Sequence, residues 1–272
     1  MEFSYIIFVP SGNTTALVVG LETKANKRRL IQDWILRKHP DVEQVGFVSK
    51  DASNPQLVMT GGEFCGNATR SAAHYFLGGS PGTISIQASG VEKPLEAGIT
   101  NTYETWIKMP VNENDDRLSE VGDGLYFVKM EGISHLIVSQ RRSFPYLSCN
   151  NVDGDKLKQS AEALLKEHGL YGGMACGVIF TENVLDMIKI HPCVFVLTAE
   201  TAYYETACGS ACVAVALLDA VFRHGNVGLQ LLQPSGQIIN ASIEYKNGKI
   251  SEARIGGTVT MGERLTGGFD VE

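Results

Sequence analysis

Short segments in which apolar and polar residues alternate recur along the chain, and this pattern predicts strands. The expected strands cover residues 4–10, 44–50, 55–60, 83–89, 105–111, 125–130, 134–140, 176–182, 189–199, 229–234, 238–246 and 251–260. Other segments have the spacing of helices, and these cover residues 27–39, 67–79, 155–169 and 210–225. The pattern therefore indicates a mixed protein with more strands than helices.

A polar and acidic stretch, residues 111–124, is the best candidate for a linker. The two halves that it separates have the same order of elements. Each has strands, an amphipathic helix, more strands, and then an apolar helix that follows a cysteine. The shared order suggests an internal duplication, and chance similarity of two alanine-rich helices is the alternative.

Composition narrows the class of protein. The chain has 272 residues, of which 44% are hydrophobic and 19% charged, with a net charge of −7. No basic run is present, which argues against nucleic acid as a partner. No segment approaches the roughly 20 apolar residues of a membrane span, and the N-terminus does not resemble a signal peptide. We therefore expect a cytoplasmic protein without a membrane partner.

The cysteines do not form a metal motif. They are Cys65, Cys149, Cys176, Cys193, Cys208 and Cys212. No C-x-x-C pair occurs, and the close pair Cys208 and Cys212 lacks a second cluster that would complete a zinc site. We expect reduced thiols and no metal.

Two of the cysteines stand at the start of the alanine-rich helices. Cys65 lies in "EFCGNATR" and Cys208 in "ETACGSAC", and each is followed by glycine. A helix N-terminus presents unpaired N–H groups and a partial positive charge. We therefore expect each thiol to have a pKa below the usual value of about 8.5. The same N–H groups can hold a carboxylate without lysine or arginine.

If the two halves face each other, the two sulfurs can approach one substrate Cα from opposite sides. One thiolate would remove the Cα proton, and the other thiol would return a proton to the opposite face. The helix N-termini would stabilise the charge that develops on the substrate carboxylate. This chemistry is amino-acid racemisation or epimerisation without a cofactor. The alternative is that both cysteines are buried packing residues, as we expect for the other four.

The segments "FCGNATRSAA" and "ACGSACVAVA" closely match the two catalytic motifs of the diaminopimelate epimerase family, whose members are cofactor-independent, two-thiol racemases and epimerases. The resemblance extends over most of the chain. It implies that Cys65 and Cys208 are the catalytic base and acid. The carboxylate-binding residues that it implies are Gly66, Asn67, Gly209 and Ser210.

Three more segments resemble functional parts of that family. The segment "FVPSGNTTALVV" is similar to the opening strand and turn, which implies that Asn13 binds substrate. The segment "EQVGFV" resembles the one that carries a substrate-contacting glutamine, here Gln44. The segment "SHLIV" resembles the one with a histidine near the first thiol, so His135 is a candidate helper. A structural histidine is the equal alternative.

The resemblance also implies a fold of the α+β class. It consists of two pseudo-symmetric α/β domains, each a curled, mostly antiparallel sheet around a central helix. We place the domains at residues 1–113 and 114–262, with a last strand at about 263–272 that returns to the first domain. The active site is expected in the cleft between them. Homodimers are common in the family, which makes a homodimer the candidate assembly.

The residues that would hold the distal end of diaminopimelate differ in this chain. In diaminopimelate epimerase an adjacent Glu–Arg pair precedes the second cysteine. With a one-residue deletion Glu200 matches the glutamate, which assigns it to the α-ammonium, but Thr201 replaces the arginine. Thr60 and Ala175–Cys176 stand where the family has two asparagines. An anionic distal group would lack its bidentate partner, so diaminopimelate is disfavoured.

Glu43 beside Gln44 favours a substrate with a neutral or cationic polar side chain. The segments "EQVGF" and "GGEFCGNATR" look most like the histidine racemase branch, which supplies D-histidine to opine-type metallophores. The expected reaction is therefore L-histidine to D-histidine without a cofactor. Alternatives are diaminopimelate epimerase, a racemase of another polar amino acid, and a non-catalytic amino-acid-binding protein. Glu43 as an exposed loop acid is also open.

Overall fold

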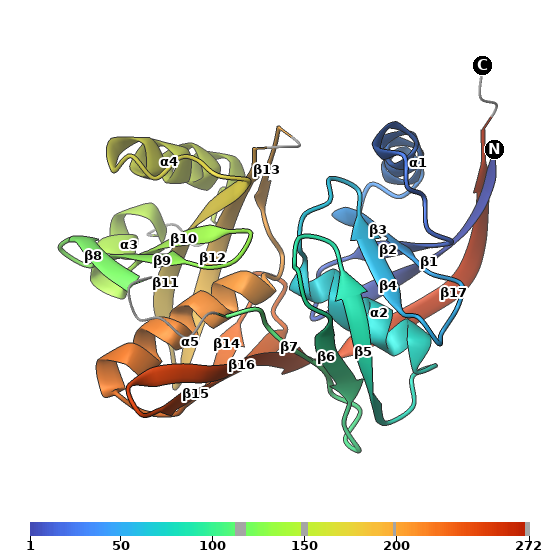
Figure 1. The fold of residues 1–272 in the computed structure, drawn as a ribbon. Helices are drawn as coiled ribbons and strands as arrows, with labels where there is room; N and C mark the ends of the chain where they lie inside the picture. The colour runs from blue at the N-terminus through green and yellow to red at the C-terminus, as the bar shows by residue number, and fades with distance from the viewer. Residues whose placement is uncertain (112–117, 148–151, 198–199, 270–272) are drawn as a thin grey trace. The chain divides into compact units, whose positions relative to one another are not determined.

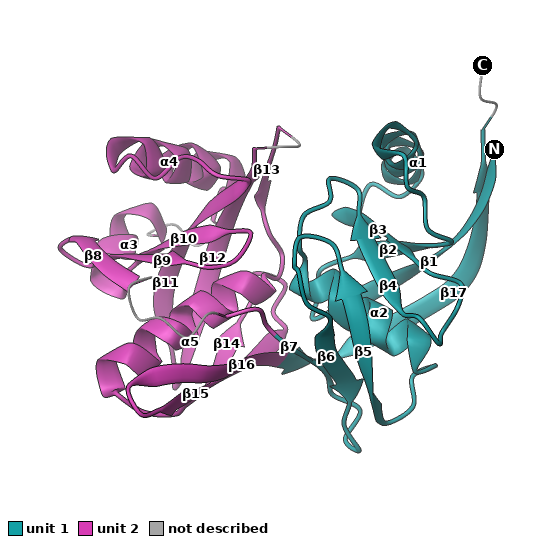
Figure 2. Cartoon of the chain, in the orientation of Figure 1, with its two compact units in different colours: residues 1–108, 256–272 teal, residues 109–255 magenta. Residues whose placement is uncertain are grey.

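The computed structural model describes residues 1–111, 118–147, 152–197 and 200–269 (Figure 1). The chain divides into two units, residues 1–108 with 256–272 (unit 1) and residues 109–255 (unit 2), which are coloured separately in Figure 2. Each unit has strands around an apolar helix that follows one of the two predicted catalytic cysteines.

Unit 1 starts with a pair of antiparallel strands and continues through a parallel crossover. Its elements are β1 (Glu2–Pro10), β2 (Thr15–Val19), α1 (Ala25–Lys38), β3 (Gln44–Val48), β4 (Gln56–Met59), α2 (Gly66–Phe76), β5 (Gly82–Ala88), β6 (Leu95–Ile99), β7 (Thr105–Lys108) and β17 (Val259–Gly268). The pairs β1–β2 and β3–β4 are antiparallel, and β2–β3 and β4–β5 are parallel. Strands β5, β6 and β7 form an antiparallel meander.

Unit 2 repeats this order of pairings. Its elements are β8 (Leu118–Gly122), β9 (Leu125–Lys129), β10 (Ser134–Val138), α3 (Gln140–Leu147), α4 (Gly154–Glu167), β11 (Ala175–Val184), β12 (Met187–Val196), β13 (Thr201–Tyr204), α5 (Gly209–Arg223), β14 (Val227–Leu232), β15 (Ile238–Lys246) and most of β16 (Lys249–Gly257). The pairs β9–β10 and β11–β12 are antiparallel, β10–β11 and β12–β14 are parallel, and β14–β15 is antiparallel. The sequence of antiparallel and parallel pairs therefore matches unit 1 from β1 to β6.

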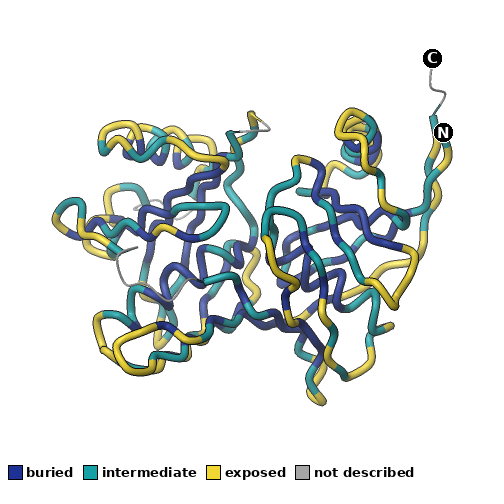
Figure 3. Tube along the Cα trace, in the orientation of Figure 1, coloured by how far each residue is buried: buried dark blue, intermediate teal, exposed yellow. Residues whose placement is uncertain are grey.

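Small side chains allow α2 and α5 to be enclosed by strands. In α2 every residue from Gly66 to Ala73 is buried, and in α5 the alanines and valines from Ala211 to Ala216 are buried. Figure 3 shows the buried positions of each unit along its strands and these inner helices. Each cysteine helix is therefore a core element of its own unit, so the position of its N-terminus is fixed by packing.

The outer helices α1 and α4 bury only one side. Ile31 and Ile35 of α1 pack on unit 1, and Leu157, Ala161 and Leu164 of α4 pack on unit 2, at the spacing of one helical face. Asp153 caps α4, because its side-chain Oδ1 accepts from the N–H groups of Asp155 and Lys156. The cap explains why this helix begins one residue before the predicted 155–169.

The boundaries between units differ from the expected 113/114 and 262/263. The N–H of Met109 donates to Ala253 O, which places Met109 in unit 2. The N–H of Ser11 donates to Thr258 O, and β17 pairs with β1 from Val259 onward. The return to unit 1 therefore begins at residue 256, and the predicted single strand 251–260 is two strands, β16 and β17.

The prediction of a linker at residues 111–124 is wrong for residues 118–122. Residues 118–122 form β8, which pairs antiparallel with β9, and Val121 packs against the core of unit 2. Residues 112–117 of that stretch lie outside the described residues. The strands β2, β6 and β13 and the helix α3 were also not predicted.

The expectation that the other four cysteines are buried packing residues is confirmed for the three that the structure describes. Cys176, Cys193 and Cys212 are fully buried and unbridged, and Cys149 lies outside the described residues. In the described part of the chain no helix combines the length and the hydropathy that a membrane crossing requires.

Candidate active site

Three of the predicted site residues, Gln44, Asn13 and Glu43, join Cys65 in one cluster in unit 1. The Cys65 thiol donates to Gln44 Oε1 at 3.0 Å. Gln44 Nε2 donates to Asn13 Oδ1 at 2.6 Å and to Thr15 Oγ1 at 2.9 Å. Asn13 Nδ2 in turn donates to Glu43 Oε2 at 2.8 Å. The chain of contacts from Glu43 to Cys65 forms one hydrogen-bonded network.

The register of two parallel strands produces this network. Thr15, the first residue of β2, is paired with Gln44, the first residue of β3. The turn before β2 therefore carries Asn13 to the same sheet end as Gln44, and the N–H of Glu43 donates to Thr14 O. Strand β4 runs antiparallel to β3, so its last residue leads the chain to Cys65 at this end.

Cys65 is the N-cap residue of α2. Its Sγ accepts from the N–H of Ala68 at 3.4 Å, as an N-cap side chain does. Gly66 and Asn67 follow as the first helical residues, whose N–H groups have no acceptor within the helix. A substrate carboxylate is the kind of acceptor that such N–H groups hold.

Arg70 of α2 supports the start of this helix. It is fully buried and donates through Nη1 to Asn67 Oδ1 at 3.3 Å. Its Nη2 donates to Ser11 Oγ and Thr258 O, and its Nε donates to Thr105 O at 3.0 Å. Arg70 therefore ties the cysteine helix to the turn that carries Asn13 and to the segment that returns from unit 2.

Cys208 is the N-cap residue of α5 in unit 2 and is 3% exposed. Its Sγ lies 3.4 Å from Ser210 Oγ, and Ser210 Oγ lies 2.9 Å from His135 Nε2. The predicted helper His135 thus contacts the second cysteine motif through Ser210, whereas the resemblance implied a place near the first thiol. Gly209 and Ser210 are the first helical residues and occupy the positions that Gly66 and Asn67 have in unit 1.

His135 is fully buried, and burial lowers its pKa to about 3. Its Nδ1 has no hydrogen-bond partner among the described residues. Gly177 packs closely against this nitrogen, since a Cβ on Gly177 would lie only 2.8 Å from it. A buried N–H without a partner costs more than a lone pair without one, so we assign the proton to Nε2. His135 then donates to Ser210, which leaves the Ser210 hydroxyl proton for the Cys208 sulfur.

The expectation of a lowered thiol pKa is wrong for Cys208. Burial raises the pKa of this thiol well above its usual value, and the charge of Glu205 and a hydrogen bond to it act in the same direction. The Ser210 hydroxyl and the N–H of Ala211 act in the opposite direction but do not prevail. Desolvation of the thiolate therefore outweighs the helix N-terminus at this position.

Replacing Glu205 by glutamine is expected to lower the pKa of Cys208, because a negative charge beside the thiolate is removed. Alkylation of Cys208 by iodoacetamide, followed by mass spectrometry, will then rise at lower pH than in the wild-type protein. The control is Glu120→Gln, which changes an exposed carboxylate of β8. An unchanged pH profile for Glu205→Gln would contradict the electrostatic role of Glu205.

Glu200 does not join the cluster at Cys208 in unit 2. It is exposed in a turn before β13, with φ 54°, and its carboxylate has no hydrogen-bond partner among the described residues. The carboxylate that interacts with the Cys208 thiol belongs to Glu205. A glutamate precedes the cysteine in both motifs, and this shared pattern could have identified Glu205 from the sequence. The assignment of Glu200 to the α-ammonium stays a prediction.

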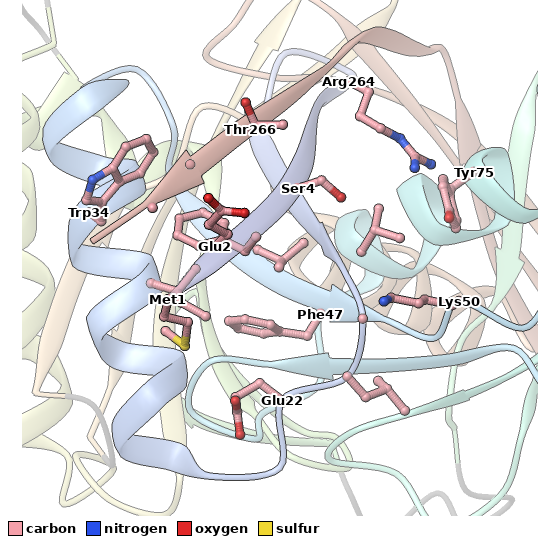
Figure 4. A pocket seen from close by; sticks show the side chains of 18 residues that line it. Met1, Glu2, Ser4, Glu22, Trp34, Phe47, Lys50, Tyr75, Arg264 and Thr266 are labelled. Atoms are coloured by element: carbon pink, nitrogen blue, oxygen red, sulfur yellow. The ribbon is translucent and has the colours of Figure 1, made fainter. Parts of the chain in front are cut away.

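Unit 1 also has a hollow of about 1100 Å³, shown in Figure 4, which lies away from the hydrogen-bonded network at Cys65. It is lined by side chains from β1, α1 and β17, with Lys50, Tyr75 and Arg264 on one side and Trp34 on the other. None of the predicted site residues lines it. Among the described residues no group of three His, Cys, Asp or Glu side chains is arranged to hold a metal ion.

Known proteins with the same fold include amino-acid isomerases. A hydroxyproline epimerase from Agrobacterium vitis, solved with trans-4-hydroxy-L-proline, matches with a TM-score of 0.65 at 11% identity, over 97% of this chain and 92% of that one. A phenazine biosynthesis protein of the PhzF family from Enterococcus faecalis matches with a TM-score of 0.62 at 16% identity, over 99% and 100%. At these identities the likeness is one of fold.

The sequence comparisons are more specific. A histidine racemase from Fusobacterium nucleatum subsp. nucleatum is 27% identical over 243 residues, which cover 85% of this chain and 86% of the relative. The sequence model described as "Histidine racemase CntK N-terminal domain" matches residues 2–264, a range that contains both cysteine motifs. The chain therefore belongs to the histidine racemase family that this model describes.

Proposed function

We propose that the protein is a cofactor-independent histidine racemase that uses Cys65 and Cys208 as the base and the acid at Cα. Family membership makes it an isomerase that acts on an amino acid. The observation that carries the finer proposal is the hydrogen-bonded network that joins Glu43, Asn13 and Gln44 to the Cys65 thiol. That network combines a proton-transfer group with side chains that can bind a polar substrate.

In the proposed reaction one sulfur is a thiolate and the other a thiol. The thiolate takes the Cα proton, and the electron pair of the broken C–H bond is delocalised into the substrate carboxylate. The thiol then donates its proton to the opposite face of Cα, which inverts the configuration and exchanges the roles of the two sulfurs. The proposal requires that both sulfurs reach the same Cα.

The N-termini of α2 and α5 support this reaction through their first N–H groups. These groups and the helix dipoles favour negative charge, which increases on the carboxylate in the transition state. The Cys65 proton is held by Gln44 Oε1, whose orientation is fixed by the contacts of Gln44 Nε2. Burial raises the pKa of Cys208, which suits this residue to the role of the thiol that donates a proton to Cα.

The first test is Cα-proton exchange in D2O without added pyridoxal phosphate. Reduced protein is incubated with single L-amino acids, namely histidine, L,L-diaminopimelate, proline, glutamate, lysine and arginine, and the Cα proton is followed by NMR. Exchange and inversion of histidine are expected. Exchange of diaminopimelate instead would assign the chain to the alternative epimerase, and binding without exchange would indicate a non-catalytic amino-acid-binding protein.

Glu43 is proposed to accept a hydrogen bond from the imidazole of the substrate. Glu43→Gln keeps the shape of the side chain but removes its charge, so we expect KM for histidine to rise about tenfold, which corresponds to about 1.4 kcal/mol, with a smaller change in kcat. The matched control is Glu92→Gln, an exposed acid of the same unit. An unchanged KM would exclude Glu43 as a specificity residue.

The proposal extends to three further points that rest on the resemblance. We expect the enzyme to act in the cytoplasm, to form a homodimer, and to supply D-histidine for an opine-type metallophore. Sedimentation of the purified protein tests the homodimer. A monomer that is active at assay concentration would exclude it as a requirement.

A further inference from the structure

We infer that Gln233 is a positioning residue for Cys208, an inference that rests on the proposed function of that thiol. Gln233 follows the last residue of β14 and is fully buried. Its Oε1 accepts from the backbone N–H of Cys208 at 3.0 Å. The contact joins an uncharged side chain of a distant turn to the main chain of the proposed catalytic residue.

Two further contacts fix the orientation of the Gln233 amide. Its Nε2 donates to Leu231 O at 2.9 Å and to Cys212 Sγ at 3.2 Å. If the amide were flipped, its oxygen would face Leu231 O and its NH2 would face the N–H of Cys208. Both contacts would then be repulsive, so only one orientation satisfies these groups. Gln233 is therefore a rigid acceptor for Cys208.

The position of the Cys208 N–H affects the direction in which the Cys208 side chain points. Cys208 is the N-cap residue, with extended backbone (φ −128°, ψ 110°), and the helix begins at the next residue. The peptide group before Cys208 is outside the helical hydrogen-bond ladder, so α5 alone does not fix it. Gln233 supplies this missing contact and thereby sets where Cβ and Sγ point.

Both units have a contact, here called the brace, between the turn after the strand that follows the cysteine helix and the segment before the cysteine. Ser89 follows β5, the first strand after the Cys65 helix, and its Oγ donates to Glu63 O at 2.7 Å. In unit 2 the N–H of Ser235, in the turn after β14, donates to Thr206 O at 2.9 Å. Glu63 and Thr206 each lie two residues before the cysteine. In both units this turn therefore holds the segment that leads to the thiol.

Gln233 adds to this shared brace a contact with the cysteine itself. An amide suits the position because its oxygen accepts a hydrogen bond without a full charge. Glutamate would place a second negative charge near a thiol whose pKa Glu205 already raises. Methionine has nearly the same shape but no acceptor, which makes Gln233→Met the direct test.

The test compares Gln233→Met with Gln237→Met, the same substitution at an exposed position of the same hairpin. For Gln233→Met we expect kcat for histidine to fall by up to about 100-fold, as for a misplaced catalytic group, with little change in KM. The pH profile of Cys208 alkylation should move to higher pH, since Ser210 and the Ala211 N–H no longer align with the sulfur. Gln237→Met should match the wild type in both measurements.

Isotope effects distinguish a positioning role of Gln233 from a purely structural role. With α-deuterated L- and D-histidine, the primary isotope effect on kcat should become larger for the enantiomer whose proton Cys208 removes, and not for the other. Equal losses for both enantiomers with an unchanged alkylation profile would overturn the inference. If Gln233→Met does not fold, Gln233→Glu is measured in the same way, and an unchanged Cys208 profile there would also overturn it.

The two hypotheses can fail separately. A wild-type protein that does not racemise histidine contradicts the proposed function, whereas the alkylation of Cys208 still reports on Gln233. A wild-type protein that racemises histidine, with Gln233→Met indistinguishable from Gln237→Met, contradicts only the positioning role.

Discussion

Replacing either Cys65 or Cys208 by serine is expected to lower the rate of histidine racemisation by about 1000-fold or more, within the range for loss of a general acid or base. A serine hydroxyl has nearly the same size but cannot donate or accept the Cα proton at neutral pH as a thiol does. Circular dichroism of the products measures racemisation. The control Cys193→Ser alters a core thiol of β12, so it should reduce stability but keep kcat in the folded protein.

The two serine variants should also differ from each other. Each retains one thiol, which can remove and return the proton of only one enantiomer. In D2O we therefore expect each variant to exchange the Cα proton of a single enantiomer without inversion, and the preferred enantiomer should be opposite in the two variants. Racemisation by Cys208→Ser at the wild-type rate would exclude the two-thiol reaction.

Arg70→Met is expected to reduce the free energy of unfolding by about 3 kcal/mol or more, because four acceptors, three of them in buried contacts, lose a charged donor at once. These acceptors are Asn67 Oδ1, Ser11 Oγ, Thr105 O and Thr258 O. Methionine fills much of the same volume, so a cavity contributes little. Urea unfolding followed by tryptophan fluorescence measures the change.

The matched control for Arg70 is Arg29→Met, on the exposed face of α1. An exposed helix position should change stability by no more than about 0.5 kcal/mol. If Arg70→Met is as stable as this control, then the buried guanidinium does not hold α2 to its surroundings, and another contact must fix the start of the Cys65 helix.

Local sequence predicted the existence and the approximate starts of the two cysteine helices. Residues 67–79 and 210–225 were expected, and α2 and α5 begin one residue earlier, at the glycine after each cysteine, and end at Phe76 and Arg223. Helix α3 was missed because Pro145 lies inside it, which argues against a helix. Tertiary contacts overcome that cost, since the buried Ser143 Oγ donates to Val138 O and accepts from the N–H of Thr181.

The partners of the two thiols depend on packing over long sequence separations. The resemblance identified Asn13 and Gln44, but only the register of β2 and β3 joins them to Glu43 and Cys65. Nothing in the residues near Cys208 indicated Gln233, which lies 25 positions away. The raised pKa of Cys208 was likewise invisible, because burial is a property of the folded unit.

The pairing of β17 with β1 has a consequence for synthesis on the ribosome. Unit 2 is continuous in sequence and is complete once residue 255 has been made, whereas unit 1 lacks strand β17 until residues 259–268 emerge. Domains made in order usually fold from the N-terminus first. The topology here permits the reverse order, in which the Cys208 region reaches its final structure while the Cys65 region, translated earlier, still lacks its closing strand.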